Sequence, residues 1–459
     1  MQLVAYGAQD IYLTGNPQIT FFKVVYRRHT NFAVESIEQT FNGQADFNKR
    51  VTATISRNGD LIQQMYLEVV LPDTVTNDVL TVWTYGVGNA LVKQAEIEIG
   101  GQLIDRQYGD WMNIWTELTV PAGKRDGYDN MVGNAVTAST EQAGGVDADA
   151  SQVRLYVPFQ FWFNRNPGLA LPLIALQYHE VKLNLELRPL ADLVQNYGYY
   201  STTIPTGSLQ VCKLYVDYVY LDTDERRRFA QVSHEYLIEQ VQFTGSETIP
   251  VSNYNKNITL NFNHPVKELI WVHTTANHTT AYSNSGTINA VGAGSWFNYS
   301  GSDWCGCDSF TTALLQLNGH DRFSVRYADY FRKVQNYEHH TRVPRVGSLG
   351  VSGAAAINGT ELSGTTSDTR RTSLRQFIYS YSFALSPEEH QPSGTCNFSR
   401  IDNAVLQLNY NVDSQLGHTT TTSELYRTLA RSSLNLNVYA VNYNVLRIMS
   451  GMGGLAYSN

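Results

Sequence analysis

Long stretches of the chain alternate apolar with polar residues. This period-two pattern places one face of a strand against a core and the other toward water, and it is typical of half-buried antiparallel strands. Helical spacing is confined to short pieces at 109–118, 222–230, 327–338 and 386–390. We therefore predict an all-β protein of sandwiches or barrels with short helices in its loops, and we exclude a parallel α/β sheet. The alternating runs include 97–99, 181–187, 211–220, 406–408 and 434–438.

A faint internal duplication divides the chain. Short motifs of the first half recur in the same order in the second half, at an offset that grows from about 200 residues. One β unit copied in tandem, with longer loops in the second copy, explains this better than chance does. The matched motifs are Glu38-Gln39 with Glu239-Gln240, Met65-Tyr66-Leu67 with Leu269-Ile270-Trp271, 97–111 with 315–330, and Val216-Asp217-Tyr218 with Val441-Asn442-Tyr443.

The charged segment 221–228 follows the last strand of the first copy and is suited to a short exposed helix. We predict an N-terminal arm at 1–25, a first sandwich at 26–222, a linker at 223–234 and a second sandwich with a C-terminal tail at 235–459. Segments rich in Ser, Thr, Gly and Asn are predicted to be surface loops. Long loops of this kind destabilise a fold only slightly, because the entropic cost of closing a loop grows slowly with its length. They are 130–150, 274–308, 342–372 and 411–422.

Composition narrows the class of protein further. The 459 residues are 42% apolar and only 16% charged, which excludes intrinsic disorder. The formal net charge of −8 disfavours direct contact with nucleic acid, despite local basic clusters at 23–28 and 226–228. No apolar run approaches the roughly 20 residues of a transmembrane helix, and the N-terminus does not resemble a secretory signal. Synthesis in the cytosol is expected.

No motif of an established catalytic or phosphate-binding type is present, and we predict no catalysis, no cofactor and no metal site. Four groups of residues are weaker candidates for a metal site or for acid-base catalysis, and each has a plainer structural interpretation. In the order in which they are named below, these interpretations are a loop thiol pair, surface histidines on a strand, the polar face of a strand and a short turn. Cys212 and Cys396 lie in apolar strand-like runs, where thiols act as small apolar groups. The four candidates are Cys305 with Cys307, His339 with His340, Glu96 with Glu98, and Glu388-Glu389-His390.

The N-terminal run 2–32 closely resembles the start of the major capsid proteins of large icosahedral double-stranded DNA viruses, and the likeness is nearest to the algal, chlorella-virus type. Five further stretches agree with the same family, so the resemblance covers the chain from end to end. The loops at 274–308 and 342–372 follow no motif of the family. The agreeing stretches are 55–62, 168–182, 234–240, 391–403 and 442–454.

The resemblance implies a double jelly roll, which is two eight-stranded antiparallel sandwiches in tandem. Three copies would form a pseudo-hexagonal capsomer that tiles an icosahedral shell, as a structural protein without catalysis. The implied partners are the chain itself, neighbouring capsomers, and minor capsid and penton proteins. An internal membrane would lie nearby without being spanned, and nucleic acid would not be contacted. The implied location is the virion, with synthesis and assembly in the host cytoplasm.

By the same resemblance, the N-terminal arm would lie under the capsomer. We expect the turn that contains Pro17 to redirect the arm, and Phe21, Phe22 and Tyr26 to anchor it beneath the sandwiches. Proteins of this family are often glycosylated, at sites outside the usual triplet. The candidate glycosylation sites, Asn277, Asn298 and Asn358, are therefore loose candidates among the loop asparagines.

Two alternatives remain open at this point. A lectin or glycosidase built on β-sandwiches would use Trp296, Tyr299 and Trp304 to stack on sugar rings. A signal peptide and a pair of carboxylates in a cleft would favour it. A monomeric cytosolic scaffold is the other alternative, and the mass in solution would distinguish it from a capsid subunit.

Overall fold

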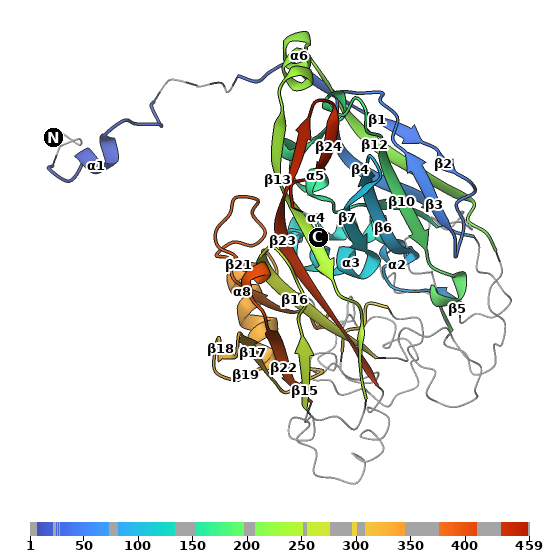
Figure 1. The fold of residues 1–459 in the computed structure, drawn as a ribbon, viewed down its shortest axis with the longest axis vertical. Helices are drawn as coiled ribbons and strands as arrows, with labels where there is room; N and C mark the ends of the chain where they lie inside the picture. Colours follow the sequence, from blue (N-terminus) through green and yellow to red (C-terminus); the bar gives the residue numbers. More distant parts are fainter. Residues whose placement is uncertain are drawn as a thin grey trace, which may run out of the picture.

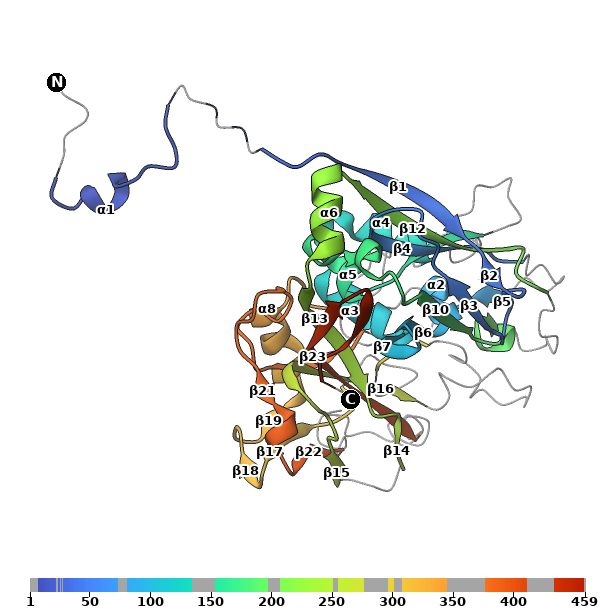
Figure 2. The same cartoon turned by 45° about the horizontal axis from the view of Figure 1, so that its top comes forward.

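The computed structural model describes residues 7–21, 24, 26, 28–72, 81–133, 153–196, 207–250, 255–275, 296–300, 308–344, 376–410 and 433–457. Two β-sandwiches lie side by side, and the N-terminal arm projects from one end of the molecule (Figure 1). Turned by 45°, the arm still extends away from both sandwiches (Figure 2). All strand pairings within the described residues are antiparallel, as the alternating pattern predicts.

The first sandwich consists of two sheets that enclose an apolar core. Its first sheet has the order β1 (Phe32–Gln39), β12 (Val211–Leu221), β4 (Leu61–Val70) and β8 (Arg154–Pro158), and β9 (Leu171–Pro172) also pairs with β4. Its second sheet has the order β2 (Phe41–Asn42), β3 (Arg50–Thr54), β10 (Val181–Leu187), β6 (Val92–Ile99) and β7 (Gln102–Tyr108). A small ladder joins β5 (Thr81–Trp83) to β11 (Val194–Asn196).

The second sandwich is built in the same way. Its first sheet has the order β13 (His234–Phe243), β23 (Leu434–Met449), β16 (Pro265–Thr275) and β20 (Tyr379–Ser382), with β14 (Glu247–Ile249), β21 (Cys396–Asn397) and β24 (Met452–Leu455) attached. Its second sheet has the order β15 (Asn255–Thr259), β22 (Ala404–Asn409), β17 (Thr312–Leu317) and β18 (His320–Asp321), with β19 (Arg326–Tyr327) on β17.

Burial along the strands follows the alternation in the sequence. In β10 the side chains of Val181, Leu183, Leu185 and Leu187 are buried, whereas the polar residues between them are half-buried. Leu183 lies opposite both Ala53 and Ile97, so three strands contribute to the same core layer. The buried apolar residues of the two sandwiches form one continuous cluster that extends across the joint between them.

The strand orders confirm the duplication. The order β1-β12-β4-β8 is repeated by β13-β23-β16-β20, and β3-β10-β6-β7 is repeated by β15-β22-β17-β18. The predicted match between β12 and β23 is wrong by one residue. Met65 of β4 lies opposite Val216 of β12, so the matched motifs would place Leu269 of β16 opposite Val441 of β23. Leu269 instead lies opposite Ala440. β-Bulges interrupt both pairings at different places, and such shifts leave no signal in the sequence.

The predicted helices at 109–118 and 222–230 are confirmed as α3 (Gly109–Thr119) and α6 (Thr223–Gln231). The prediction at 327–338 corresponds to a π-helical turn, η5 (Tyr330–Val334), followed by α8 (Gln335–His339). The segment 386–390 is a turn and not a helix. Helix α4 (Ala122–Val132) was not predicted, because its two glycines weaken its helical pattern. The remaining short helices are α1 (Ile11–Thr14), α2 (Val87–Leu91), α5 (Trp162–Arg165), η1 (Pro167–Leu169), η2 (Leu173–Ala175), η3 (Leu190–Asp192) and η7 (Phe398–Arg400).

In the part of the chain that the structure describes, no helix is both long and apolar enough to span a bilayer.

Candidate functional site at the joint of the two sandwiches

The two sandwiches meet along strands that end their sheets. β7 is the last strand in the second sheet of the first sandwich, and β13 is the first strand in its sheet of the second sandwich. The backbone N–H of Val241 donates to Oδ1 of Asp105 at 3.3 Å, and the side-chain amide of Gln240 donates to the carbonyl of Ile104. An open sheet edge exposes unpaired backbone groups. The joint therefore covers part of two edges.

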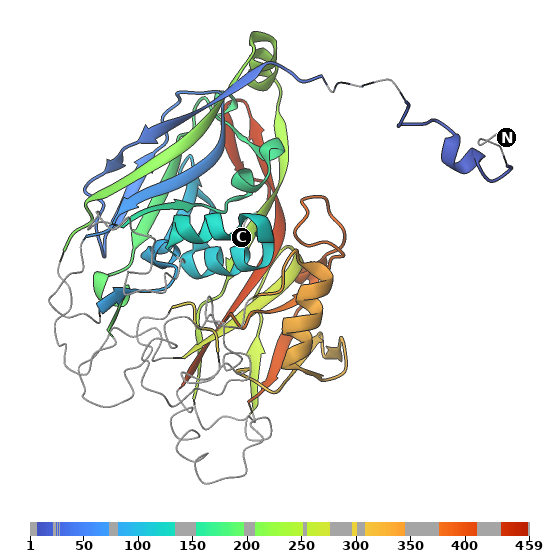
Figure 3. The same cartoon turned by 180° about the vertical axis from the view of Figure 1, so that it is seen from behind.

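Aromatic side chains close the joint next to these polar contacts. Tyr108, at the end of β7, meets Phe243 of β13 edge to face, with 5.1 Å between ring centroids. Trp111 of α3 contacts Tyr439 of β23 at 5.4 Å, and Tyr439 is only 1% exposed. Figure 3 shows α3 and α4 between the strands of the two sandwiches. These contacts make the joint an extension of the core.

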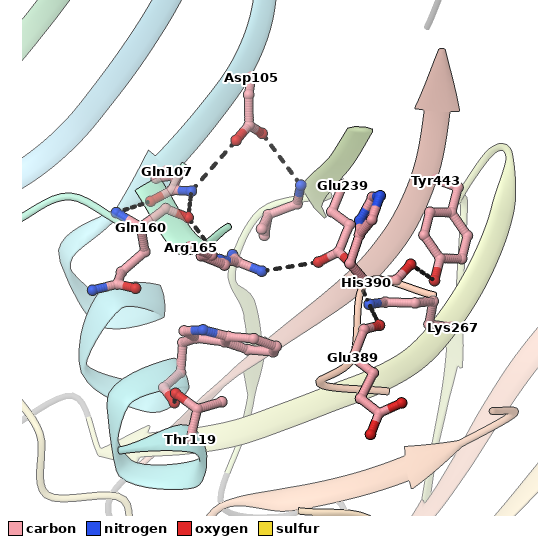
Figure 4. A network of polar contacts seen from close by, with 12 residues as sticks. Asp105, Gln107, Thr119, Gln160, Arg165, Glu239, Lys267, Glu389, His390 and Tyr443 are labelled. Carbon is pink, nitrogen blue, oxygen red and sulfur yellow. Dashed lines mark hydrogen bonds and ion pairs between the residues drawn. The ribbon is translucent and has the colours of Figure 1, made fainter. Parts of the chain in front are cut away.

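A chain of buried charges crosses the joint (Figure 4). Arg165 of the first sandwich lies 3.2 Å from Oε2 of Glu239 on β13, and Lys267 of β16 lies 2.8 Å from Oε1 of the same carboxylate. Burial by itself raises the pKa of Glu239, but the imidazole of His390, whose Nδ1 lies 3.6 Å from Oε1, and the charges of Lys267 and Arg165 outweigh it and lower this pKa to about 2. Glu239 is therefore ionised under all ordinary conditions and neutralises two cations, one from each sandwich.

Asp105 lies at the other end of this network. Burial raises the pKa of its carboxyl to about 7, although the N–H of Val241 and the charge of Arg165 favour the ionised form. The side-chain amide of Gln107 donates to its Oδ2 at 3.4 Å. The charge of Asp105 consequently changes near neutral pH, at the contact that links β7 to β13.

The C-terminal hairpin of β23 and β24 also contacts the first sandwich. Its turn has positive φ at Ser450 and Gly451, and the carbonyl of Gly451 accepts from the N–H of Tyr178 at 3.0 Å. A Cβ atom on Gly453 would lie 2.6 Å from the side chain of Leu176. The glycine-rich tail thus allows a close approach between the two sandwiches.

The prediction that His339 and His340 are surface histidines on a strand is wrong. They lie at and just beyond the end of α8, and the side chain of His340 is fully buried between two carboxylates. Its Nε2 lies 3.2 Å from Oε2 of Glu268, and its Nδ1 lies 3.0 Å from Oε1 of Glu388. Burial alone lowers the pKa of His340, but these two carboxylates raise it to about 9. Glu388, in the predicted turn, therefore takes part in a charged cluster.

The predicted anchor residues of the arm are exposed in this chain. Pro17 is exposed, and the side chains of Phe21 and Tyr26 are 91% and 82% exposed. Phe22 lies outside the described residues. The arm does not pack beneath its own sandwiches, so any anchoring must use another molecule. Its role stays a prediction.

Of the candidate glycosylation sites, only Asn298 lies within the described residues. It is half-buried, and its Oδ1 accepts a hydrogen bond from the N–H of Ser300 at 3.2 Å. Asn277 and Asn358 fall outside the described residues. Glycosylation at these three positions stays a prediction.

The two described aromatic residues that were proposed to stack on sugars, Trp296 and Tyr299, do not form a sugar-binding surface. Tyr299 is fully buried. The ring of Trp296 is covered by the guanidinium of Arg188 at 3.8 Å, and its Nε1 donates to the carbonyl of Asp192. Trp304 lies outside the described residues. The lectin alternative therefore loses two of the three residues on which it rested.

The described residues among the remaining candidates for catalysis or metal binding have structural roles. Glu96 accepts hydrogen bonds from Arg50 and Arg106, and Glu98 accepts one from Asn184, so these carboxylates belong to the polar face of β6 as expected. Cys212 and Cys396 are free thiols that pack against the core, also as expected, whereas Cys305 and Cys307 lie outside the described residues. The described residues contain no group of three or more ligands that could hold a metal ion.

Comparison with known protein families agrees with the tandem architecture. Residues 20–222 match the model of the major capsid protein N-terminus, and residues 225–375 and 372–454 match that of the large eukaryotic DNA virus major capsid protein. The chain belongs to this capsid protein family. The two models divide the chain at the segment that contains α6.

Individual members of the family cover the whole chain. The major capsid protein of Pyramimonas orientalis virus is 53% identical over 100% of this chain and 99% of its own length. That of Paramecium bursaria Chlorella virus 1 is 45% identical, again over 100% and 99%. A chain from a quasi-atomic structure of the PBCV-1 virus capsid superposes with a TM-score of 0.71 at 41% identity, covering 96% of this chain and 100% of that chain. The double jelly roll is confirmed, the relatives are structural proteins and not enzymes, and the chain is a virion component.

The buried charged residues near the joint were not predicted from the sequence. Lys267 and Glu268 interrupt an otherwise apolar stretch of β16, and both are at most 1% exposed. Two adjacent charges inside a buried strand were the available signal, because such residues are almost never fully buried unless they are paired.

Proposed function

We propose that three copies of this chain assemble into a pseudo-hexagonal capsomer, and that such capsomers tile the icosahedral shell of a large DNA virus. The observation that carries the proposal is the repeated strand order of the two sandwiches. A ring of three such chains contains six similar units, so a threefold assembly gains a nearly sixfold outline. Family membership supports the same conclusion.

The composition suits extensive contacts between chains. Interfaces that form permanently are depleted in charged residues and enriched in tyrosine. The chain has 29 Tyr residues and only 16% charged residues. In a closed ring each contact occurs three times, so weak individual contacts suffice for a stable capsomer.

The solution mass of the purified chain tests this proposal. Light scattering is expected to show a stable species of three times the chain mass of 51.5 kDa, with a hexagonal outline in negative-stain images. A folded monomer at micromolar concentration would contradict the trimer. It would favour a monomeric scaffold.

We further propose that the arm connects the capsomer to molecules beneath it, namely minor capsid or penton proteins at the inner face of the shell, during assembly in the host cytoplasm. The described part of the arm presents large apolar side chains to solvent, including Ile19 at 90% and Phe21 at 91% exposure. Apolar groups exposed in this way gain free energy when a partner covers them. The internal membrane would lie nearby without being spanned.

Deletion of residues 1–25 is expected to leave soluble trimers that do not assemble into shells. The measurement is a count of complete particles by electron microscopy in cells where the variant is the only copy. The double variant Phe21→Ser/Tyr26→Ser should show the same defect, whereas Thr20→Ser, in the same segment, should assemble normally. Normal particle numbers from the deletion would contradict a role for the arm.

A further inference from the structure

The contact between β7 and β13 is narrow and lies beside a groove. Each strand stands at the end of its own sheet, and no strand ladder joins the two within the described residues. Two hydrogen bonds cross between them, from the N–H of Val241 to Oδ1 of Asp105 and from the side-chain amide of Gln240 to the carbonyl of Ile104. A groove of about 210 Å³, partly open to solvent, runs along these contacts, and we call it the joint groove. It is lined by residues 103–106, 108, 240–244 and 261.

Asp105 is buried because the second sandwich covers the outer side of β7. Alternate residues of a strand share a face, so Asp105 and Gln107 project to the same side. They are only 3% and 1% exposed. Charged side chains are almost never fully buried unless they are paired, and an edge strand would normally leave a carboxylate in water. At this position the contact with β13 takes the place of water.

Asp105 has no cation of its own. Among the described residues, the positive charge that acts on it is the guanidinium of Arg165. That guanidinium lies 3.2 Å from Oε2 of Glu239, and it also acts on Glu268. In Figure 4, Arg165 points to Glu239, whereas Asp105 faces Gln107. One cation therefore serves three carboxylates, and Asp105 receives the smallest share.

The neighbouring charges on β7 do not compensate Asp105 either. Nε of Arg106 donates to Oε1 of Glu96 at 2.7 Å, so this cation serves β6. The hydroxyl of Tyr108 also interacts with Arg106. The titratable groups that surround Asp105, directly or through Arg165, are Arg106 and Tyr108 of β7, Arg165 of α5, and Glu239 and Glu268 of the second sandwich.

The charge of Asp105 depends on whether the contact is closed. In the closed contact the carboxylate has lost its hydration, and this burial raises the pKa of Asp105 to about 7, although the N–H of Val241 and the charge of Arg165 favour ionisation. When β13 moves away from β7, water from the joint groove hydrates the carboxylate, and its pKa returns toward the ordinary value of 3.8. The closed contact favours the protonated form, and the open contact favours the ionised form.

We infer that Asp105 is a proton-operated lock between the two sandwiches: its neutral form holds β13 against β7, and its ionised form draws water into the joint groove and loosens the contact. The inference goes beyond the proposed capsomer, because it concerns each chain by itself. In a shell made of such chains, every joint is tighter in mildly acidic than in neutral surroundings.

The direction of the effect follows from proton binding. Because the pKa of Asp105 in the closed joint, about 7, lies above the ordinary value of 3.8, the closed joint binds the proton more tightly than the open joint does. The tightening is complete below about pH 4 and is lost as the pH rises through 7. Between these limits the ratio of closed to open joints falls by about tenfold per pH unit, and above pH 7 it levels off.

Hydrogen–deuterium exchange at the backbone amide of Val241 tests the lock, because this N–H is bonded to Asp105 itself. Its protection factor, corrected for the intrinsic exchange rate at each pH, is expected to fall by at least about tenfold between pH 5 and pH 7 and to change little between pH 7 and pH 8. The amide of Leu67 is the internal reference, because β4 lies between β12 and β8 in the first sandwich. Its protection should not follow this curve.

The variant Asp105→Asn removes the titration and keeps an oxygen for the N–H of Val241. Its protection factor at Val241 is expected to stay high and nearly constant from pH 5 to pH 8. The matched control is Asp46→Asn, because Oδ1 of Asp46 also accepts from a distant backbone N–H, that of Leu209, at 3.0 Å. Burial alone would raise the pKa of Asp46, but the N–H groups of Leu209 and Phe47 lower it. Asp46 therefore stays ionised from pH 5 to pH 8, and its replacement should leave the curve at Val241 unchanged.

Each outcome decides the inference. A protection factor at Val241 that does not change with pH in the unmodified chain overturns it, and so does an equal pH dependence in Asp105→Asn. If Asp105→Asn does not fold, Arg165→Gln gives the answer. This variant removes the charge that favours ionisation, so the fall in protection should move to higher pH, and an unmoved curve overturns the inference.

Discussion

Replacing Glu239 by glutamine is expected to lower the free energy of unfolding by about 3 to 5 kcal/mol, the range for breaking a buried ion pair on one side. The side chain of Lys267 is only 1% exposed and lies 2.8 Å from this carboxylate, and Arg165 contacts its other oxygen. The neutral amide would leave both cations in the interior without their shared charge partner. Because one cation belongs to each sandwich, the joint should loosen first.

Urea denaturation followed by tryptophan fluorescence measures this effect. The matched control is Glu235→Gln on the same strand, because Glu235 pairs with Arg447 at 2.7 Å while both side chains are at least half exposed. Exposed pairs contribute about 0 to 1 kcal/mol, so the control should be nearly neutral. Adding Lys267→Met to the Glu239 variant should restore part of the lost stability. Equal losses in Glu239→Gln and Glu235→Gln would contradict a special role for the buried cluster.

Stability is expected to fall as the pH rises from about 6.5 to about 9, through the titration of His340. Its pKa of about 9 in the folded chain lies above the ordinary value of 6.5, so the folded state binds this proton more tightly than the unfolded state does. The contribution is complete below the unfolded pKa and disappears as the pH passes the folded pKa. A shift of this size corresponds to roughly 3 kcal/mol. Above pH 9 a neutral imidazole would leave the buried carboxylate of Glu268 without its cation.

The measurement is the free energy of unfolding at several pH values between 6 and 10. The double variant His340→Gln/Glu268→Gln removes the titrating pair, and its stability should vary less across this range than that of the unmodified chain. The charged groups that face His340 are Glu268 of β16 and Glu388 of the loop before β21. Parallel pH curves for the two proteins would rule out His340 as the source of the dependence.

Much of the architecture was predictable because it depends on local periodicity. The alternation at 181–187 predicted a strand, and every apolar position of β10 is buried. The recurrence of short motifs predicted two copies of one unit, and the strand orders agree. Register was not predictable to the residue, since the bulges near Glu268 and Asp217 shift the pairing by one position.

The fold class, the tandem duplication and membership of a capsid family follow from the amino-acid sequence alone, because each depends on patterns that adjacent residues carry. The residues that join the sandwiches could be identified only from the folded chain. Glu239 and Lys267 are 28 residues apart, and Arg165 is 74 residues from Glu239. The tertiary structure also showed that His340, one residue beyond a short helix, is buried between Glu268 and Glu388. The strength of a buried charge depends on its distance to partners that folding brings together, and spacing along the chain does not encode that distance.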